Sequence, residues 1–155
     1  MTPVMSFWPS IYKKIDNQIK LIEYRRTFPK DCNFAYMYIS KPVKAICGII
    51  YFGKKYSLAD WKAQYLHDPE ISARISSYSD CYRYGMEVAA FQKIQPITLQ
   101  SLKENVAGFV APQSYLLLEN NAELAKYIEK NIVFIGERKE NIFTNAYPEH
   151  ICKKY

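Results

Sequence analysis

Two neighbouring segments that are apolar on both faces constrain the fold of this chain more than any other feature. They cover residues 33–40 (NFAYMYIS) and 43–52 (VKAICGIIYF), with Lys41-Pro42 as the turn between them. A strand with one solvated side alternates apolar and polar residues, so we expect both of these strands to be buried on each side, as in a closed barrel. Gly48 within the second strand predicts a bulge or a sharp bend, which a barrel requires.

The remaining segments alternate between helical and strand patterns. Polar residues 137–155 show no periodicity and are expected to be partly disordered. The resulting order, strands in a curled sheet with helices between them, predicts an α+β fold, a small mixed β-barrel with inserted helices. The expected helices begin near Pro9, Ser57, Pro69, Thr98 and Asn120, and the other expected strands cover 4–7, 19–26, 83–94 and 131–136.

The composition indicates a globular protein with a mildly basic surface. The chain has 155 residues, of which 49% are hydrophobic, and this length can bury a core without metal or disulfide staples. A formal net charge of +6 favours a polyanionic partner. The 14 tyrosines suit half-buried strands and stacking surfaces, since each ring is apolar with a polar tip.

Residue spacing gives no support for a metal site or a cofactor. The cysteines are too far apart in sequence for a zinc knuckle or a C-x-x-C pair, and the two histidines have no ligand spacing. The cysteines are Cys32, Cys47, Cys81 and Cys152, and the histidines are His67 and His150. We therefore predict no metal and no cofactor. The chain has no secretory signal and no apolar segment long enough to span a bilayer, so we expect a cytoplasmic protein without a membrane partner.

Charges of both signs interrupt the apolar pattern of segment 19–26. They are Lys20, Glu23, Arg25 and Arg26. A strand that served only a core would not need them, whereas a strand lining a binding cleft would. Alternation along a strand puts Glu23 and Arg25 on one face, and Lys20 leaves the preceding turn where it can lean towards the same side. The alternative is a structural ion pair of Glu23 with Arg25 or Lys20 that closes one end of the barrel.

Four blocks of this chain, in order, resemble ASCH domains of the PUA-like superfamily. The segment WPSIYKKIDNQIKLIEYRR is similar to their proline-led helix and G-x-K-x-x-E-x-R motif, which here is QIKLIEYR at 18–25. The segments KPVKAICGII, GMEVAAFQKIQPITLQSL and APQSYLLLE resemble later blocks of one ASCH subgroup. Gln18 replaces the motif glycine, so the turn must avoid the left-handed conformation or accept strain.

The resemblance implies a domain organisation and a partner. It covers residues 4–118 and implies an ASCH/PUA-like domain at 1–118, with 119–155 as a helical and strand extension packed on it or trailing from it. It also implies RNA or nucleotide binding in a cleft lined by Lys20, Glu23 and Arg25, and the cleft chemistry is compatible with DNA. Lysine donates to phosphate or a base carbonyl, arginine offers a planar fork, and glutamate accepts from an exocyclic amine.

Five further residues are candidates for nucleic-acid contacts. The loop residues Gln113 and Ser114 could bring an amide and a hydroxyl to the cleft, and the ring of Tyr115 could stack on a base. Alternatively, Tyr115 plugs the core and Gln113 caps a helix. Trp8 is either a stacking platform at the cleft rim or a core residue. Arg26 belongs to a basic run that either follows a phosphate backbone or is simply solvated.

Hydrolysis is an alternative function. A related ASCH subgroup resembles small amidohydrolases acting on N4-acylcytidines through lysine, threonine and glutamate, and other members are proposed ribonucleases. Lys20 matches that lysine, but Glu23 stands where the threonine would be, so Glu23 would have to activate a water with help from Lys20. Glu87 is the third candidate catalytic residue if the protein is an enzyme. It would point into the cleft as a base or pair with Arg26 or Arg83.

A third function that the resemblance leaves open is an interaction module for a transcription coregulator. ASCH domains occur in coactivator-like proteins, and residues 119–155 would then be the docking element.

Overall fold

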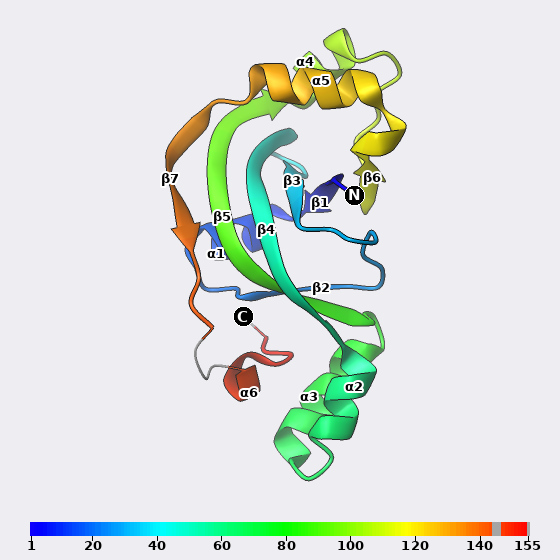
Figure 1. Ribbon diagram of the computed structural model, residues 1–155, viewed down its shortest axis with the longest axis vertical. Coiled ribbons are helices and arrows are strands. Elements are labelled where there is room, and N and C mark those ends of the chain that lie inside the picture. Colours follow the sequence, from blue (N-terminus) through cyan, green and yellow to red (C-terminus); the bar gives the residue numbers. More distant parts are fainter. Residues whose placement is uncertain (144–146, 155) are drawn as a thin grey trace.

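The computed structural model describes residues 1–143 and 147–154, which form one strongly curled β-sheet with helices at its ends (Figure 1). The strands are β1 (Pro3–Phe7), β2 (Ile22–Arg25), β3 (Phe34–Ile39), β4 (Ala45–Ser57), β5 (Tyr84–Thr98), β6 (Tyr115–Leu117) and β7 (Phe134–Glu140). The helices are α1 (Pro9–Asp16), α2 (Leu58–Gln64), α3 (Pro69–Ser79), α4 (Leu99–Asn105), α5 (Ala122–Asn131) and α6 (Tyr147–His150), and η1 (Leu118–Asn120) is a 3-10 turn.

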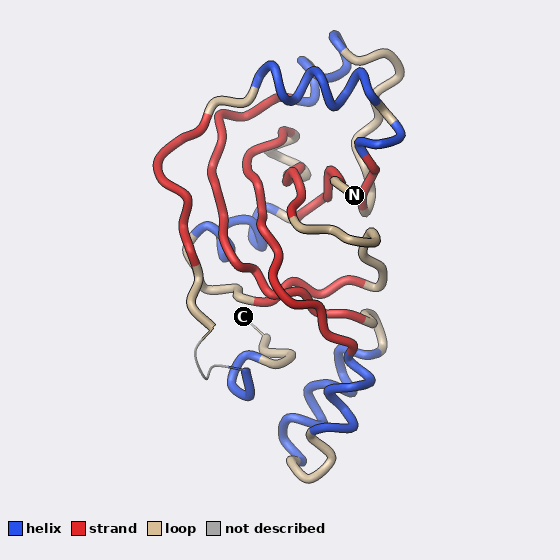
Figure 2. The backbone as a smooth tube through the Cα atoms, in the orientation of Figure 1, coloured by secondary structure: helices blue, strands red, loops and turns tan. Residues whose placement is uncertain are grey.

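The sheet is mixed and follows the order β2-β5-β4-β3-β1-β6. β2 pairs with the first part of β5, and β7 pairs with β5 further along, at 90–94. β1 and β3 are parallel, and the other neighbours are antiparallel. The two longest strands, β4 and β5, run side by side and bend together through the middle of the molecule (Figure 2). The predicted α+β class with a small barrel-like sheet is confirmed, and the sheet takes the form of a half-barrel.

Gly48 lies where β4 bends. The pairing of β4 with β5 shifts register between Ile46 and Gly48, which confirms the predicted bulge. A Cβ at Gly48 would come within 2.6 Å of the Phe91 ring. Phe91 is fully buried, so a side chain at Gly48 would displace a packed core ring.

Several helix starts agree with the sequence. The Ser57 hydroxyl accepts a hydrogen bond from the Asp60 backbone N–H at the start of α2, and the Thr98 hydroxyl does the same for Ser101 at the start of α4. Leu66 follows the end of α2 at Gln64 and is 63% exposed.

Strand ends were predicted less accurately. β4 and β5 continue beyond the apolar runs that predicted them, as far as the capping residues of α2 and α4. β2 begins at Ile22 and not at residue 19, because the chain is still in a turn at 17–20.

The C-terminal part of the chain is folded. β7 overlaps the strand expected at 131–136 and continues to Glu140 in its pairing with β5. The prediction of partial disorder is therefore wrong for 137–140, and also for Ile151 and Cys152, which are buried in a cluster with β2, α2 and α3. Positions 144–146 and 155 of the predicted range lie outside the described residues. All seven residues of β7 are exposed, so no buried face marks the extension of this edge strand beyond 136 in the sequence.

Within the described part of the chain, helices fall short of the length and hydrophobicity needed to cross a membrane.

Candidate nucleic-acid interface

A cleft of about 1040 Å³ opens where β1 leads into α1. One wall is formed by α1, β2 and the loop before β6, and the other by the end of α3, the segment after it and the C-terminal segment. The lining is cationic, since its basic side chains are Lys14, Lys20, Arg25, Lys41 and Lys154, and Glu23 is the acid among the described lining residues. Such a hollow suits an anionic guest.

The turn after α1 places Lys20 in the cleft. The helix ends with hydrogen bonds from the Ile19 and Lys20 backbone N–H groups to the Lys14 carbonyl, at 2.9 and 3.1 Å. Gln18 has a φ of +57°, so the position of the motif glycine does adopt the left-handed conformation. Lys20 therefore precedes β2, and strand alternation does not decide where its side chain points.

Lys20, Glu23 and Arg25 form a chain of charges along one side of the cleft. The Lys20 ammonium lies 3.8 Å from one Glu23 carboxylate oxygen, and an Arg25 guanidinium nitrogen lies 3.6 Å from the other. Lys20 is 7% exposed and Glu23 is 6% exposed. Burial lowers the pKa of Lys20 below its usual value, partly offset by the Glu23 carboxylate. The cleft thus holds a recessed ammonium that releases its proton more readily than a surface lysine.

Arg25 also joins the two ends of the sheet. Its guanidinium donates to the Ser6 carbonyl at 2.6 Å and to the Ser114 carbonyl at 3.3 Å, and lies 4.8 Å from the centre of the Phe7 ring. β2 is at one end of the strand order, while Ser6 and Ser114 belong to β1 and the loop before β6 at the other. The ion pair that the sequence offered as an alternative to a cleft is therefore present, and it lies in the wall of a cleft.

The other candidate binding residues lie in different places. Gln113 and Ser114 line the cleft, and so does Trp8, which is 74% exposed. The alternative of a core position for Trp8 is wrong. Tyr115 belongs to β6, pairs with Met5 and packs against the core, in agreement with its structural alternative. Arg26 is exposed outside the cleft.

Glu87 lies on β5, outside the cleft. Its carboxylate accepts hydrogen bonds from the Tyr56 hydroxyl at 2.7 Å and from the Lys54 backbone N–H at 3.3 Å. These groups take the place of the expected partners Arg26 and Arg83.

Sequence reasoning missed the wall formed by α3 and the C-terminal segment. This wall contributes Ser77, Tyr78, Cys81, Tyr82 and Lys154. Tyr82 is 38% exposed and is a second accessible ring in the cleft. These residues are distant in sequence from Lys20. The high tyrosine content of the chain was the only sequence feature that indicated further aromatic rings in a binding surface.

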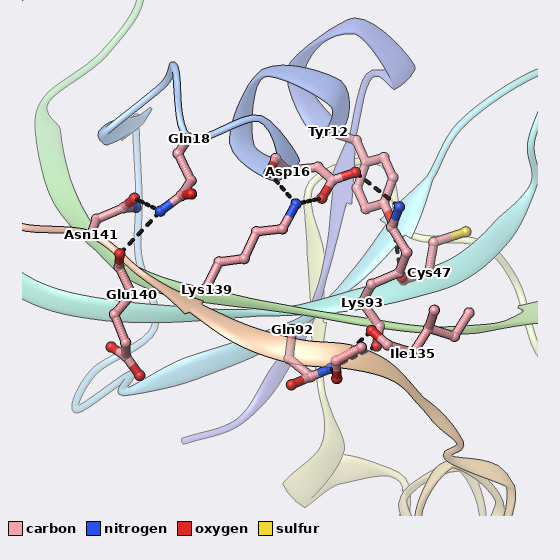
Figure 3. A network of polar contacts seen from close by, with 11 residues as sticks. Tyr12, Asp16, Gln18, Cys47, Gln92, Lys93, Ile135, Lys139, Glu140 and Asn141 are labelled. Atoms are coloured by element: carbon pink, nitrogen blue, oxygen red, sulfur yellow. Dashed lines mark hydrogen bonds and ion pairs between the residues drawn. The ribbon is translucent and has the colours of Figure 1, made fainter.

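A polar network between the end of α1 and the strands β5 and β7 holds the turn that carries Lys20 (Figure 3). Asp16 forms ion pairs with Lys93 of β5 at 3.0 Å and with Lys139 of β7 at 2.6 Å. The Gln18 amide donates to the Glu140 carbonyl at 3.0 Å and to the Asn141 side chain at 3.1 Å. Burial alone would raise the pKa of Asp16, but hydrogen bonds from Lys139 and Lys93 lower it below its usual value.

The described residues contain no group of three or more histidine, cysteine, aspartate or glutamate side chains able to hold a metal ion.

Comparison with known proteins identifies the family. No protein-family model matches the chain. A curated relative, the "ASCH domain-containing ribonuclease" of Zymomonas mobilis, is 32% identical over 123 residues, which cover 72% of this chain and 80% of the relative. This chain belongs to the ASCH domain family. The family predicted from the four sequence blocks is thereby confirmed.

Solved ASCH structures share the fold. The crystal structure of ASCH from Zymomonas mobilis has a TM-score of 0.64 and 25% identity, over 85% of this chain and 96% of that chain. A serine-to-alanine mutant of that protein gives the same TM-score and coverage at 24% identity. The curled sheet with inserted helices is therefore the ASCH fold.

Proposed function

We propose that this ASCH domain binds single-stranded RNA in the cleft beside Lys20. One observation carries the proposal: recessed cations, Lys20 and Arg25, and an exposed indole, Trp8, meet in the same hollow. The description of the Zymomonas mobilis relative as a ribonuclease supports RNA as the ligand.

Each part of a nucleotide has a matching group in the cleft. The Lys20 ammonium can donate to a phosphate or a base carbonyl, and the Arg25 guanidinium, already held by two carbonyls, can face a phosphate. The exposed ring of Trp8 can stack on a base. The Gln113 amide offers both a donor and an acceptor to a base edge.

The recessed position of the cations favours a single strand over a duplex. A duplex keeps its bases stacked on one another, so neither Trp8 nor a buried ammonium could reach a base without opening it. Sequence-specific RNA recognition uses unpaired bases that can leave the stack and meet aromatic side chains.

Fluorescence anisotropy with a labelled single-stranded RNA hexamer tests this proposal. We expect Lys20→Ala to weaken binding about tenfold or more, because a charge-assisted hydrogen bond contributes about 1.5–3 kcal/mol. Lys103→Ala is the matched control, since Lys103 is an exposed lysine on α4 outside the cleft. Competition with single-stranded DNA and duplex RNA measures the preference. Absence of RNA binding by the wild-type protein, or equal binding by both variants, contradicts the proposal.

RNA cleavage is the second candidate function, and the curated relative favours it. Glu23 would accept the proton of a water as its oxygen attacks the phosphorus. The P–O bond to the leaving oxygen would break, and Lys20 would donate a proton to that oxygen. The lowered pKa of Lys20 suits this donor role, and Arg25 would neutralise charge on the phosphate.

Electrophoresis of incubated RNA separates cleavage from binding alone. We expect wild-type protein to shorten the RNA and Lys20→Ala to leave it intact, whereas Glu87→Gln should keep the activity because Glu87 lies outside the cleft. Incubation with N4-acetylcytidine tests the amidohydrolase alternative. Intact RNA with the wild-type protein would leave binding as the function.

A further inference from the structure

The C-terminal segment, residues 147–154, contributes directly to the cleft. Lys154 lines the main cleft together with Ser77 and Tyr78 of α3. The same three residues also line a second cavity of about 380 Å³, which lies between α3 and the C-terminal segment. The two hollows are therefore neighbours, with Lys154 at their boundary.

The segment is held in place by hydrogen bonds between its backbone and side chains of β2 and α3. The Tyr24 hydroxyl accepts from the Cys152 N–H at 2.7 Å and donates to the His150 carbonyl at 3.3 Å. The Tyr78 hydroxyl donates to the Lys153 carbonyl at 2.7 Å. The Arg74 guanidinium donates to the Pro148 carbonyl at 3.0 Å. These anchors come from β2 and α3, the elements that form the cleft walls.

The second cavity shares its basic charge and one aromatic ring with the first. Its charged lining residues are Arg74, Lys153 and Lys154, and Tyr78 provides an aromatic ring shared with the main cleft. Basic side chains interleaved with aromatic rings are the pattern by which proteins follow a single-stranded backbone. A volume of about 380 Å³ lies at the lower end of the range for small-ligand pockets, whereas the main cleft is near its upper end.

We propose that the second cavity is a subsite for the next nucleotide of the same RNA strand, with Lys154 contacting the phosphate between the two hollows. This inference rests on the proposed RNA-binding function. It also makes residues 119–155 part of the binding domain rather than a separate docking element.

Charge changes at Lys154 test the subsite. We expect Lys154→Ala to weaken binding of the single-stranded RNA hexamer about fivefold, and Lys154→Glu to weaken it further. The slope of log affinity against log salt should become shallower by about 0.7, the amount for one phosphate contact on a single strand. Lys103→Ala and Lys103→Glu carry the same charge changes on α4 and should have a much smaller effect.

A second variant tests the cavity itself. Ala73 lines the second cavity and is exposed, so Ala73→Trp should fill that cavity without disturbing the core. We expect this variant to weaken binding of the hexamer while the effect of Lys20→Ala persists. Equal binding by the Lys154 and Lys103 variants, or unchanged binding by Ala73→Trp, would overturn the subsite but leave the main cleft standing. Failure of the wild-type protein to bind RNA would instead remove the proposed function.

Discussion

Among single residues, Trp8 has the environment least expected of its type. A tryptophan beside a proline-led helix more often belongs to the core, yet this ring is 74% exposed at the rim of a cationic cleft. Trp61, the other tryptophan, is buried with α3 and β2. The fluorescence of the two indoles therefore reports on different parts of the molecule, the cleft rim for Trp8 and the buried cluster for Trp61.

RNA should change the fluorescence of Trp8 and leave that of Trp61 unaltered. We expect Trp8→Phe to remove the RNA-dependent change, and Trp8→Ala to weaken RNA binding about tenfold, since stacking contributes about 1–3 kcal/mol per base. Neither substitution should alter the thermal midpoint, because the ring is largely exposed. An undiminished RNA-dependent signal in Trp8→Phe would show that the base does not reach this ring.

Part of the site could be predicted residue by residue. Alternation along β2 correctly put Glu23 and Arg25 on one side, because both lie inside the strand. Lys20 lies outside the strand and leans from the preceding turn towards the same side, as expected. The left-handed conformation of Gln18 in that turn was one of two alternatives that the sequence left open. Glu87 has a structural contact, which was one of its two predicted alternatives, but its side-chain partner is Tyr56 and not Arg26 or Arg83.

For the elements, the junction between α1 and β2 depends on distant parts of the chain. Asp16 and Gln18, at the end of α1, contact β5 and β7 (Figure 3). Sequence analysis could predict α1 from its proline start and apolar spacing. It could predict a strand at 131–136, but not that this strand continues to Glu140 and supports the turn after α1, since β7 has no buried face.

Asp16→Asn should destabilise the fold in a pH-dependent way. We expect a loss of about 2 kcal/mol in the free energy of unfolding at pH 7, since hydrogen bonds to charged groups are involved. The folded pKa of Asp16 lies below its ordinary value of 3.8, so the carboxylate stabilises the fold above that pH. This stabilisation is lost as the pH falls through the folded pKa.

Urea denaturation at a series of pH values measures this difference. The difference in the free energy of unfolding between the wild-type protein and Asp16→Asn should be largest at pH 7 and should shrink below about pH 4. If this difference in free energy stays constant into the acid range, the charge of Asp16 does not stabilise the junction between α1 and β2.

In the whole molecule, the half-barrel leaves a gap between its two ends, and the cleft lies at this gap. The sequence predicted closure because β3 and β4 are apolar on both faces. Those faces are covered by two separate clusters of buried side chains, one on each side of the sheet. Arg25 spans the two ends with its side chain. Because the sheet does not close, the charged side chains of β2 line a hollow. In a barrel closed by backbone pairing, the same side chains would be buried.

Protection of Cys81 from alkylation tests the location of RNA most directly. Cys81 is exposed and lines the cleft, whereas Cys32, Cys47 and Cys152 are buried. Burial raises the pKa of those three thiols to between about 11 and about 12, so they should react slowly. Cys81→Ser should therefore abolish the fast reaction with a maleimide reagent, as checked by mass spectrometry. We predict that saturating single-stranded RNA slows the alkylation of Cys81 at least several-fold, whereas an unchanged rate while RNA is bound would place the RNA elsewhere and contradict the account.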